Sequence, residues 1–490
     1  NLSLGYTGLP AGERQELETL INDMSALKGI TFCVSAGNLG PGLGSITSPA
    51  DSRKGISVGG YLSPAIWSLN YGWPVEQPTL WQFSSVGPYA GGIAPLVVAP
   101  ASATTTDVRW RGEYVLEEGT SIAAPYAAGG VALLIQAARQ EGIPVSPDLV
   151  RLAISRGAEP LSGYSQAEAG YGTLNLLRSW EILKERPALP LEARQGNGER
   201  GLYTRSYLPG LTYLQVANTG AVNQYLELGS TSSWIKFSQP NLQVPVRGSR
   251  SVALEYELPA EPGLYSGVIT GSDPGSEETR LEVLQTVVVP YKLTATSGAA
   301  VSGEAAAGMY RRYFFEVPEG NGQLNLRVTI PRDASGRYQG RVRMHVMDPA
   351  GRLIHASNYA GSGYPVTSGH EFLEYTLSNP AAGVWEVVVY SSVSLSQHDL
   401  TASRYTIAAS LGNWVNSEPE PPQDKYIIAS VPSAIKAGVQ NITLNFWDKL
   451  TKLPARGRVL INNLLYELKN GKVHLSITPQ DQLPWLEIAW

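Results

Sequence analysis

One serine in the chain has the surroundings that a nucleophile needs. Ser121 lies in Gly119-Thr-Ser-Ile-Ala-Ala-Pro125, after a glycine-containing turn and before an apolar run over residues 127–138 that predicts a buried helix. A hydroxyl at the start of a helix meets free backbone N–H groups and the positive end of the helix dipole, and both favour a negative charge that develops beside it. This setting suits acyl transfer to a serine. The same residues would also make an ordinary helix start, with a Thr or Ser cap and a proline in the first turn.

Five groups of residues precede Ser121 and form a series. They are Asn1-Leu-Ser-Leu-Gly5, then Thr31-Phe-Cys-Val-Ser-Ala-Gly-Asn38, then Ser48-Pro-Ala with Gly55-Ile-Ser-Val-Gly59, then Phe83-Ser-Ser-Val-Gly-Pro88, and then Val97-Val-Ala-Pro100. Each group is weak by itself, but the ordered series resembles the subtilisin-like serine peptidases over residues 1 to about 185. The resemblance implies an α/β parallel-sheet domain, present in part, that hydrolyses peptide bonds.

Within that family, the chain is most similar to the tripeptidyl-peptidase II branch. The likeness is carried by Ser35-Ala-Gly-Asn-Leu-Gly-Pro41, by Gly60-Tyr-Leu-Ser-Pro64 and by the spacing into Ser84-Ser-Val-Gly-Pro88. Farther along, Tyr310-Arg-Arg-Tyr-Phe-Phe-Glu-Val-Pro-Glu-Gly320 resembles the start of a β-domain that follows the peptidase in that branch. General subtilisin motifs could not produce this second match, so it narrows the resemblance to the branch.

The resemblance implies two catalytic residues. Ser121 would attack the scissile carbonyl, and the side chain of Asn38 would donate an N–H to the oxyanion, together with the backbone N–H of Ser121. Asn38 could instead be a plain asparagine in a glycine-rich turn, which is a common role for this residue type. The conjunction of Ser35-Ala-Gly before Asn38 and of Ser121 after it favours the catalytic interpretation.

Seven small or apolar residues are expected to bind substrate. Ser3, Leu4 and Gly5 match the strand that pairs with an extended peptide, through main-chain hydrogen bonds. The facing wall of the pocket next to the scissile bond would be Ser35, Ala36 and Gly37, with Thr47 at the floor. Small residues on both walls leave room for a substrate side chain. Ordinary sheet and turn packing is the alternative for all seven.

The general base of such a site is not evident in this sequence. A serine triad needs a histidine to take the proton and an aspartate to orient that histidine. The five histidines (His345, His355, His370, His398 and His474) lack the family's His-Gly-Thr context and lie in β-rich sequence. In the family, the aspartate and histidine precede the strand matched by Asn1-Leu-Ser-Leu-Gly5. We therefore expect a truncated reading frame or one product of a cleaved precursor, inactive without a preceding segment of the same protein.

Composition excludes several classes of protein. A net charge of -5 gives no basic face for nucleic acid, and one cysteine rules out an internal disulfide framework. That residue, Cys33, is expected to be a buried thiol. We expect no membrane span, because no apolar stretch looks long enough. Whether the protein is secreted or cytoplasmic stays open.

No metal and no cofactor are expected. Asp107, Glu113, Glu117 and Glu118 read as a solvated acidic loop rather than as metal ligands. The pair Arg311-Arg312 and the histidines of the 300–412 region are expected to be surface groups.

The first 187 residues alternate strands and helices. Apolar residues at helical spacing predict a helix that ends at Lys28-Gly29, and residues 30–35 form an apolar strand of the parallel-sheet kind. Further helices are expected from Ser121 to about Glu141, from Ser146-Pro147 onward, and from Gly170-Tyr-Gly172 to before Pro187. This alternation predicts a parallel α/β sheet covered on both faces.

The remaining residues read as β-domains. After a polar linker, residues 200–295 resemble a β-sandwich of immunoglobulin or fibronectin type, with clean alternation at Val252, Leu254, Tyr256 and Leu258. Residues 300–412 resemble a jelly-roll domain, and a Pro-rich linker leads to a small β-sandwich over 425–490 that could be incomplete. These domains are expected to brace the peptidase and to offer homo-oligomer contacts, unless Trp385, Trp414 and Trp447 are exposed platforms for binding.

Two classes of function remain open. The first is a serine peptidase that acts on peptide or protein substrates, as an exo- or an endopeptidase. The second is a non-catalytic adhesion or scaffold protein, in which a decayed peptidase half carries β-sandwich modules. Retention of both Ser121 and Asn38 favours the first, because folding requires neither.

Overall fold

The computed structural model describes most of the chain. The exceptions are residues 8–10, 90–91, 108–109, 111, 196–198, 206–210, 363–369, 413–425, 431–439, 449–453, 455–457, 462–463, 469, 478–487 and 490. The chain divides into two compact units, Asn1–Trp414 and Val415–Trp490.

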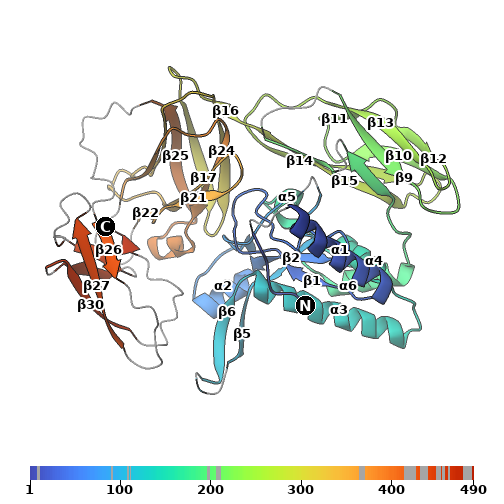
Figure 1. Cartoon of the computed structure of the whole chain (residues 1–490), viewed down its shortest axis with the longest axis horizontal. Coiled ribbons are helices and arrows are strands. Elements are labelled where there is room, and N and C mark those ends of the chain that lie inside the picture. The colour runs from blue at the N-terminus through green and yellow to red at the C-terminus, as the bar shows by residue number, and fades with distance from the viewer. Residues whose placement is uncertain are drawn as a thin grey trace. The chain divides into compact units, whose positions relative to one another are not determined.

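A mixed sheet forms the centre of the first 187 residues (Figure 1). Its parallel strands are β1 (Cys33–Ser35), β2 (Ile56–Leu62) and β4 (Val97–Pro100), and β3 (Thr79–Leu80) pairs antiparallel with β2. Single parallel bridges extend the sheet, from Leu2 to Val34 on one side and from Val98 to Thr173 on the other. The expectation of a purely parallel sheet is therefore corrected by β3. The expected strand over 30–35 is also shorter, because its pairing with β2 begins only at Cys33.

Four helices of this segment lie where the sequence predicted a helix: α1 (Ala11–Lys28), α3 (Thr120–Gln140), α4 (Pro147–Gly157) and α6 (Leu176–Glu185). Two shorter helices, α2 (Pro64–Tyr71) and α5 (Gln166–Ala169), were not predicted. The predicted start of α4 is confirmed, since the Ser146 side chain accepts a hydrogen bond from the N–H of Leu149. Cys33 is buried beneath α3, as expected, and burial raises the pKa of its thiol to about 11.

Helix α3 corrects one expectation about membranes. By length and composition it is long and apolar enough to cross a bilayer, and it is the one such helix in the described part of the chain. This is weak evidence, because the core helix of a globular protein passes the same test. Ala123, Ala127, Val131 and Leu134 of α3 pack against β1, β2 and β4.

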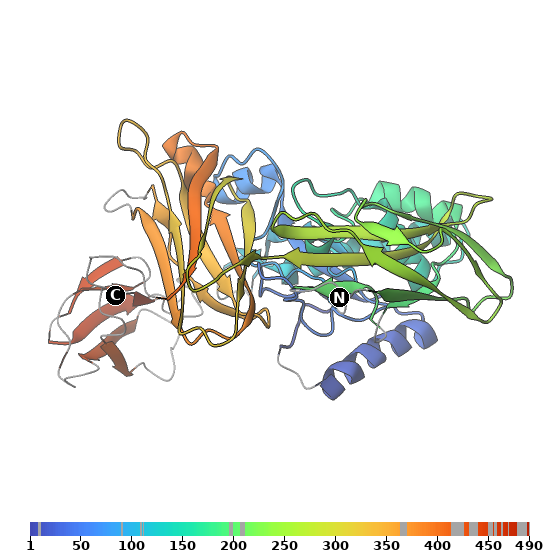
Figure 2. The same cartoon turned by 90° about the horizontal axis from the view of Figure 1, so that it is seen from above.

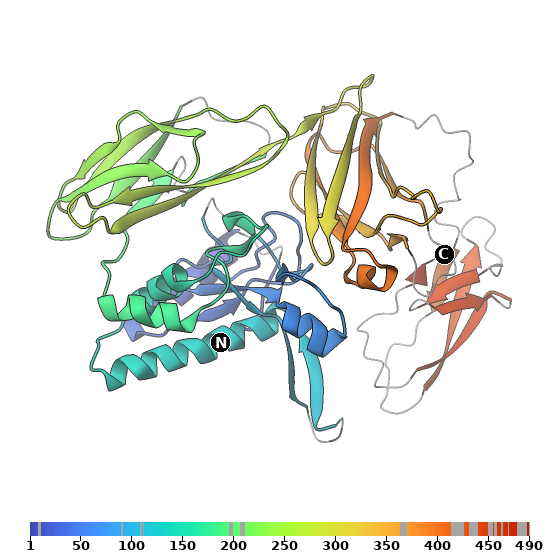
Figure 3. The same ribbon diagram turned by 180° about the vertical axis from the view of Figure 1, so that it is seen from behind.

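Just before α3, the hairpin of β5 (Ser102–Thr106) and β6 (Tyr114–Glu118) projects from the sheet (Figure 3).

Residues 192–289 form two sheets that share one core (Figure 2). The strands are β7 (Glu192–Gln195), β8 (Leu202–Thr204), β9 (Thr212–Ala217), β10 (Gln224–Ser230), β11 (Ile235–Phe237), β12 (Asn241–Val244), β13 (Ser249–Tyr256), β14 (Gly263–Ser272) and β15 (Thr279–Val289). One sheet has the order β12-β10-β14-β15-β8 and the other β11-β13-β9-β7. The alternation seen in the sequence corresponds to burial of Val252 and Leu254 in the shared core.

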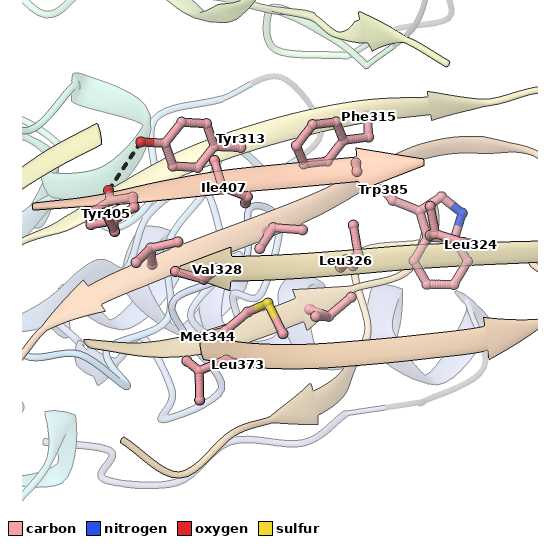
Figure 4. Packing of buried hydrophobic residues seen from close by; sticks show 14 of the residues in the cluster. Tyr313, Phe315, Leu324, Leu326, Val328, Met344, Leu373, Trp385, Tyr405 and Ile407 are labelled. Atoms are coloured by element: carbon pink, nitrogen blue, oxygen red, sulfur yellow. Dashed lines mark hydrogen bonds between the residues drawn. The ribbon is translucent and has the colours of Figure 1, made fainter. Parts of the chain in front are cut away.

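Residues 291–411 form a second pair of sheets. Their strands are β16 (Tyr291–Lys292), β17 (Ala299–Ala306), β18 (Tyr310–Val317), β19 (Gln323–Thr329), β20 (Arg341–Met347), β21 (Leu353–Ala356), β22 (Ala360–Gly361), β23 (Phe372–Ser378), β24 (Gly383–Ser391) and β25 (Ala402–Leu411), with a short helix at Val393–His398. The core between the sheets contains Trp385, which is 2% exposed, and a hydrogen bond of 3.0 Å between the hydroxyls of Tyr313 and Tyr405 (Figure 4). Trp385 is therefore a core residue and not a binding platform.

The unit Val415–Trp490 contains six short strands. They are β26 (Tyr426–Ser430), β27 (Gln440–Asp448), β28 (Arg458–Ile461), β29 (Leu464–Glu467), β30 (Lys472–Ile477) and β31 (Ile488–Ala489), in two sheets of three strands among the described residues. Trp447 is 39% exposed, whereas Trp414 lies outside the described residues.

The sheet that contains β18, β20 and β24 is buried on both faces. One face lies in the core of its own sheet pair, through residues such as Phe315, Met344 and Val387. The other face, with Phe314, Val388 and Met347, packs in one cluster with Leu43, Leu80 and Val98 of the first 187 residues. This packing joins the two segments.

A buried ion network holds the same contact together. Arg312 pairs with Glu168 at 2.8 Å and with Glu386, and it donates to the carbonyl of Pro41. Glu386 also pairs with Arg205 at 3.0 Å and accepts the N–H of Leu43 at 3.1 Å. Burial alone lowers the pKa of Arg312, but the Glu168 carboxylate and the Tyr310 phenol raise it above its usual value. The expectation that both arginines of the 311–312 pair lie at the surface is wrong for Arg312, whose side chain is 5% exposed.

We predict that Arg312→Leu lowers the free energy of unfolding of the chain by about 3–5 kcal/mol, because it leaves two buried carboxylates without their main partner. The matched control is Arg404→Leu, which breaks an exposed pair with Glu304 and should cost less than about 1 kcal/mol. Urea unfolding followed by tryptophan fluorescence measures both. Equal losses in the two variants would contradict a structural role of the network.

Candidate active site

Ser121 lies in the first turn of α3, where the chain changes direction after β6. Gly119 makes this change with a φ of 124°, a conformation that residues with a side chain rarely adopt. Its N–H donates to the carbonyl of Ala101, which ties the turn to the end of β4. The N–H groups of Ile122 and Ala123 donate to the carbonyl of Gly119 and that of Thr120 donates to Asn38, so the backbone donor beside the Ser121 hydroxyl is the N–H of Ser121 itself.

The side chain of Asn38 is held in one orientation next to this turn. Its Oδ1 accepts two hydrogen bonds from Thr120, at 3.0 Å from the backbone N–H and at 2.8 Å from the hydroxyl. The Thr120 hydroxyl oxygen in turn accepts the N–H of Gly37 at 3.2 Å. Because Oδ1 is occupied, Nδ2 is the group that Asn38 can offer to a ligand, and this residue is exposed. Thr120 was not predicted as a site residue, although its position directly before Ser121 was a signal.

The first residues of the chain lie along β1 and reach Ser121. The backbone of Leu2 pairs with Cys33 and Ser35, at 2.8 and 3.0 Å. The Ser3 hydroxyl donates to the carbonyl of Ser121 at 2.8 Å, and the Ser35 hydroxyl donates to the carbonyl of Leu4 at 3.3 Å. Ser3, predicted to bind substrate, is therefore in contact with Ser121, and Leu4, predicted likewise, is bonded to Ser35 of β1.

Thr47 lies where the two predicted walls of the pocket approach each other. It is buried, and its hydroxyl donates to the carbonyl of Ala36 at 3.1 Å. A Cβ atom placed on Gly5 would lie 2.2 Å from Thr47 Oγ1, and one on Gly37 would lie 2.6 Å from Thr47 Cγ2. Both walls thus need glycine at the point where they meet Thr47. Ser35 and Ala36 are buried, so only their main chain can line a pocket.

One histidine was predicted wrongly. His345 was expected at the surface, but it is 5% exposed and lines a cavity that Asn38 also lines. Burial, with the charge of Arg343 as a further cause, lowers the pKa of His345 to about 3, so it is a poor base at neutral pH.

The other histidines lie elsewhere. His355 stacks on Tyr375, His370 is exposed, His474 hydrogen-bonds to Thr443 in the second unit, and the side chain of His398 lies outside the described residues. Within the described part of the chain, no histidine forms a hydrogen bond with Ser121.

The acidic residues ahead of Ser121 lie on the β5–β6 hairpin or its end. Glu113, Glu117 and Glu118 are exposed, and Glu118 accepts a hydrogen bond from the hydroxyl of Tyr71 at 2.5 Å. Among the residues that the structure describes, no group of three or more His, Cys, Asp or Glu side chains could hold a metal ion.

Comparisons with known proteins agree on one family. The Subtilase family (peptidase S8) matches residues 1–174. Pyrolysin of Pyrococcus furiosus is 29% identical over 411 residues, which cover 75% of this chain and 28% of pyrolysin. Tripeptidyl-peptidase 2 of Drosophila melanogaster is 28% identical over 365 residues, 66% of this chain and 25% of that protein.

A solved structure extends the likeness to the fold. The crystal structure of Tripeptidyl Peptidase 2 (TPP II) superposes with a TM-score of 0.63 at 21% identity, over 91% of this chain and 36% of that one. The strand-rich chain with its mixed sheet and helices therefore has a TPP II-like fold. It spans only part of the length of each of these proteins.

We predict that Gly5→Ala destabilises the protein by about 1–3 kcal/mol, because the new methyl group overlaps the Thr47 hydroxyl. Thr47→Ala alone should cost about 1 kcal/mol for the lost hydrogen bond. The double variant should be more stable than the sum of the two costs predicts, and thermal unfolding of all three measures the coupling.

The control is Gly37→Ala, which should stay destabilised in the Thr47→Ala background. Its φ of 110° strains an alanine whatever space is available. Additive costs for Gly5→Ala and Thr47→Ala would contradict the contact between the two residues.

Proposed function

We propose, on the premise that residues 1–174 are a subtilase-family serine peptidase domain, that the chain cleaves peptide bonds through an acyl-enzyme on Ser121. One observation carries this proposal. The Thr120 N–H and hydroxyl fix the Asn38 amide directly beside the helix turn that bears Ser121. A fixed amide donor next to a serine at a helix start is the arrangement that stabilises a tetrahedral oxyanion.

In this mechanism each residue has one task. The Ser121 hydroxyl attacks the scissile carbonyl, and its backbone N–H and Asn38 Nδ2 donate to the oxygen that becomes negative. An extended substrate would pair with the main chain of Ser3, Leu4 and Gly5, with a side chain entering the pocket over Thr47. Ser3 is exposed, and its hydroxyl donates to the carbonyl of Ser121. Both facts support binding of a substrate along this strand.

A base must come from outside the residues described here. The part of helix α3 that continues from Ser121 supports a docked segment. Pro125, Tyr126, Gly129, Ala132 and Leu133 form an exposed apolar stripe opposite the buried face of the helix. Tyr126 is 56% exposed and Leu133 is 65% exposed. A helix that is apolar on both faces is normally covered on both.

We propose that a preceding segment of the same protein covers this stripe and supplies the histidine and aspartate. The stripe starts one turn after Ser121, so a segment on it would reach the serine hydroxyl. Without that segment the Ser121 hydroxyl has no partner to take its proton at neutral pH, and hydrolysis should be slow.

We predict that co-expression with the upstream coding sequence raises peptide hydrolysis and fluorophosphonate labelling, and that Ser121→Ala abolishes both. Asn38→Ala should lower kcat by ~10²–10³, the effect known for the oxyanion asparagine of subtilisin itself. Ser68→Ala, which changes an exposed helix serine, is the matched control and should leave both signals unchanged. Hydrolysis rates and labelling intensity on the same preparations measure the result.

Two outcomes would contradict parts of this proposal. Strong Ser121-dependent cleavage by the chain alone would show that it contains its own base. A folded, co-expressed protein without labelling at Ser121 would instead favour the non-catalytic scaffold. Mass spectrometry of the products separates tripeptide release from internal cleavage.

We further propose that the β-rich segments after residue 187 stabilise residues 1–187, called the peptidase segment from here on. The shared cluster of Leu43, Phe314 and Val388 and the Arg312 ion network support this role. Deletion of residues 188–490 should expose that cluster, so we predict aggregation or a lower melting temperature of the remaining part, measured by light scattering and calorimetry. A truncated form as soluble and stable as the whole chain would favour detachable binding modules.

Size-exclusion chromatography with light scattering on the whole chain tests the proposed homo-oligomer contacts.

A further inference from the structure

A cavity of about 790 Å³ opens beside the predicted substrate pocket. Three of its lining residues, Tyr6, Asn38 and Ile46, are the immediate chain neighbours of Gly5, Gly37 and Thr47. The cavity therefore continues from the place where the two walls and the floor of the pocket meet. Its volume suits a few residues of a peptide rather than a single side chain.

The opposite side of the cavity comes from the β20–β21 region of the first unit. Arg343 and His345 of β20 and Arg352 just before β21 line it. In the register of the sheet, His345 pairs with Val388, which pairs with Arg312 on its other side. Directly paired residues of antiparallel strands point to the same face, so Arg343 and His345 lie on the face that packs against the peptidase segment.

The cavity lining is positively charged. It contains Arg14, Arg343 and Arg352, and no Asp or Glu is among the described residues that line it. Arg14 and Arg352 already have carboxylate partners, Asp51 at 2.5 Å and Asp348 at 2.6 Å. Arg343 forms no ion pair among the described residues, and its guanidinium lies over the ring of Tyr359, with Cζ 5.7 Å from the ring centroid.

Two buried polar atoms at the cavity have no hydrogen-bond partner in the described structure. They are Nε of Arg343 and Nδ1 of His345. Buried polar atoms in proteins are normally satisfied, and an unsatisfied one costs about 1–3 kcal/mol. Neither atom is accessible to a water molecule, so a ligand in the cavity does not bond to them. What Arg343 offers to such a ligand is the positive charge of its guanidinium, which lines the cavity without an ion-pair partner among the described residues.

We propose that this cavity binds a carboxylate of the peptide substrate, on a residue near the cleaved bond. A carboxylate accepts hydrogen bonds at both oxygens and would neutralise the unpaired guanidinium of Arg343. The carboxylate can be an Asp or Glu side chain or a free C-terminus. This inference rests on the proposed function only in taking a peptide as the ligand.

The test measures binding without catalysis. The Ser121→Ala protein is titrated into fluorescein-labelled hexa-alanine peptides with an amidated C-terminus, in which one position at a time is Asp or Asn. A further peptide has only alanine and a free C-terminal carboxylate. Fluorescence anisotropy should show at least one position where Asp binds about 10- to 100-fold more tightly than Asn, the range for a charge-assisted hydrogen bond. A preference only for the free carboxylate would support the cavity with a C-terminus as its ligand.

Variants assign that preference to the cavity. Arg343→Gln should reduce it to less than about 3-fold while the Asn peptides bind as before, which also shows that the variant is folded. Arg343→Lys keeps the charge and should retain much of the preference. Arg311→Gln changes an exposed arginine on β18 of the same sheet, is the matched control and should change nothing.

Two results would overturn the inference. One is equal binding of Asp, Asn and free-carboxylate peptides, and the other is a carboxylate preference that survives Arg343→Gln. Either result leaves the proposed peptidase function intact, because that function is tested by labelling and hydrolysis at Ser121. Loss of Ser121 labelling together with an intact carboxylate preference would instead reject the peptidase and keep the cavity.

Discussion

The buried guanidinium of Arg312 is the interaction on which the arrangement of the first unit depends. It bridges Glu168 from the peptidase segment and Glu386 from the neighbouring β-strand. Removing such charges from water costs several kcal/mol per ion, which the attraction between them repays only with good geometry and further hydrogen bonds. Here the further bonds are present, since Pro41, Leu43 and Arg205 complete the network. The main effect of the network is therefore to fix the positions of its chain segments relative to one another. Its contribution to the net free energy of unfolding is the smaller effect.

That position matters for the site because the network holds the loop after Asn38. Pro41 and Leu43 are three and five residues beyond the asparagine and are bonded to Arg312 and Glu386. On its other side, Asn38 is held by Thr120 at the start of α3. Two sets of contacts thus hold the Asn38 amide. Thr120 of the peptidase segment bonds to it directly, and the β-rich sheet holds the loop that follows it through Arg312 and Glu386. Rigid support of this kind is what a preorganised donor requires.

The sequence predicted the local features of this arrangement. Helix starts and ends follow from caps and from apolar spacing, so the end of α1, the start of α4 and both ends of α3 were recognisable. The candidate residues Ser121 and Asn38 were found because each stands in a short motif. They lie next to each other in the structure, joined through Thr120.

The features that the sequence did not predict are those that depend on what covers a sheet. Alternation along β18 shows that Arg312 shares a face with Tyr310 and Phe314, but it does not say whether water or protein lies over that face. A charged residue on such a face is normally exposed. The consecutive apolar pair Phe314 and Phe315 was the available signal, because it requires burial on both faces of the strand. His345 was misjudged for the same reason, since its burial depends on the peptidase segment.

The groups proposed for bond cleavage and the group proposed for substrate recognition lie in different parts of the chain. The proposed chemistry lies in residues 1–174, within the part that matches the subtilase family. Arg343, the residue proposed to meet the substrate carboxylate, lies on β20, outside that match. Because Arg312 and His345 stand in one row across β18, β24 and β20, the network that fixes Asn38 also fixes the register of the charged side chains. A change in the register of this sheet would move Arg343 relative to Asn38, whereas a substitution at Arg343 alone leaves the Asn38 contacts untouched. Substrate preference can therefore vary through β20 while the groups proposed for bond cleavage stay constant.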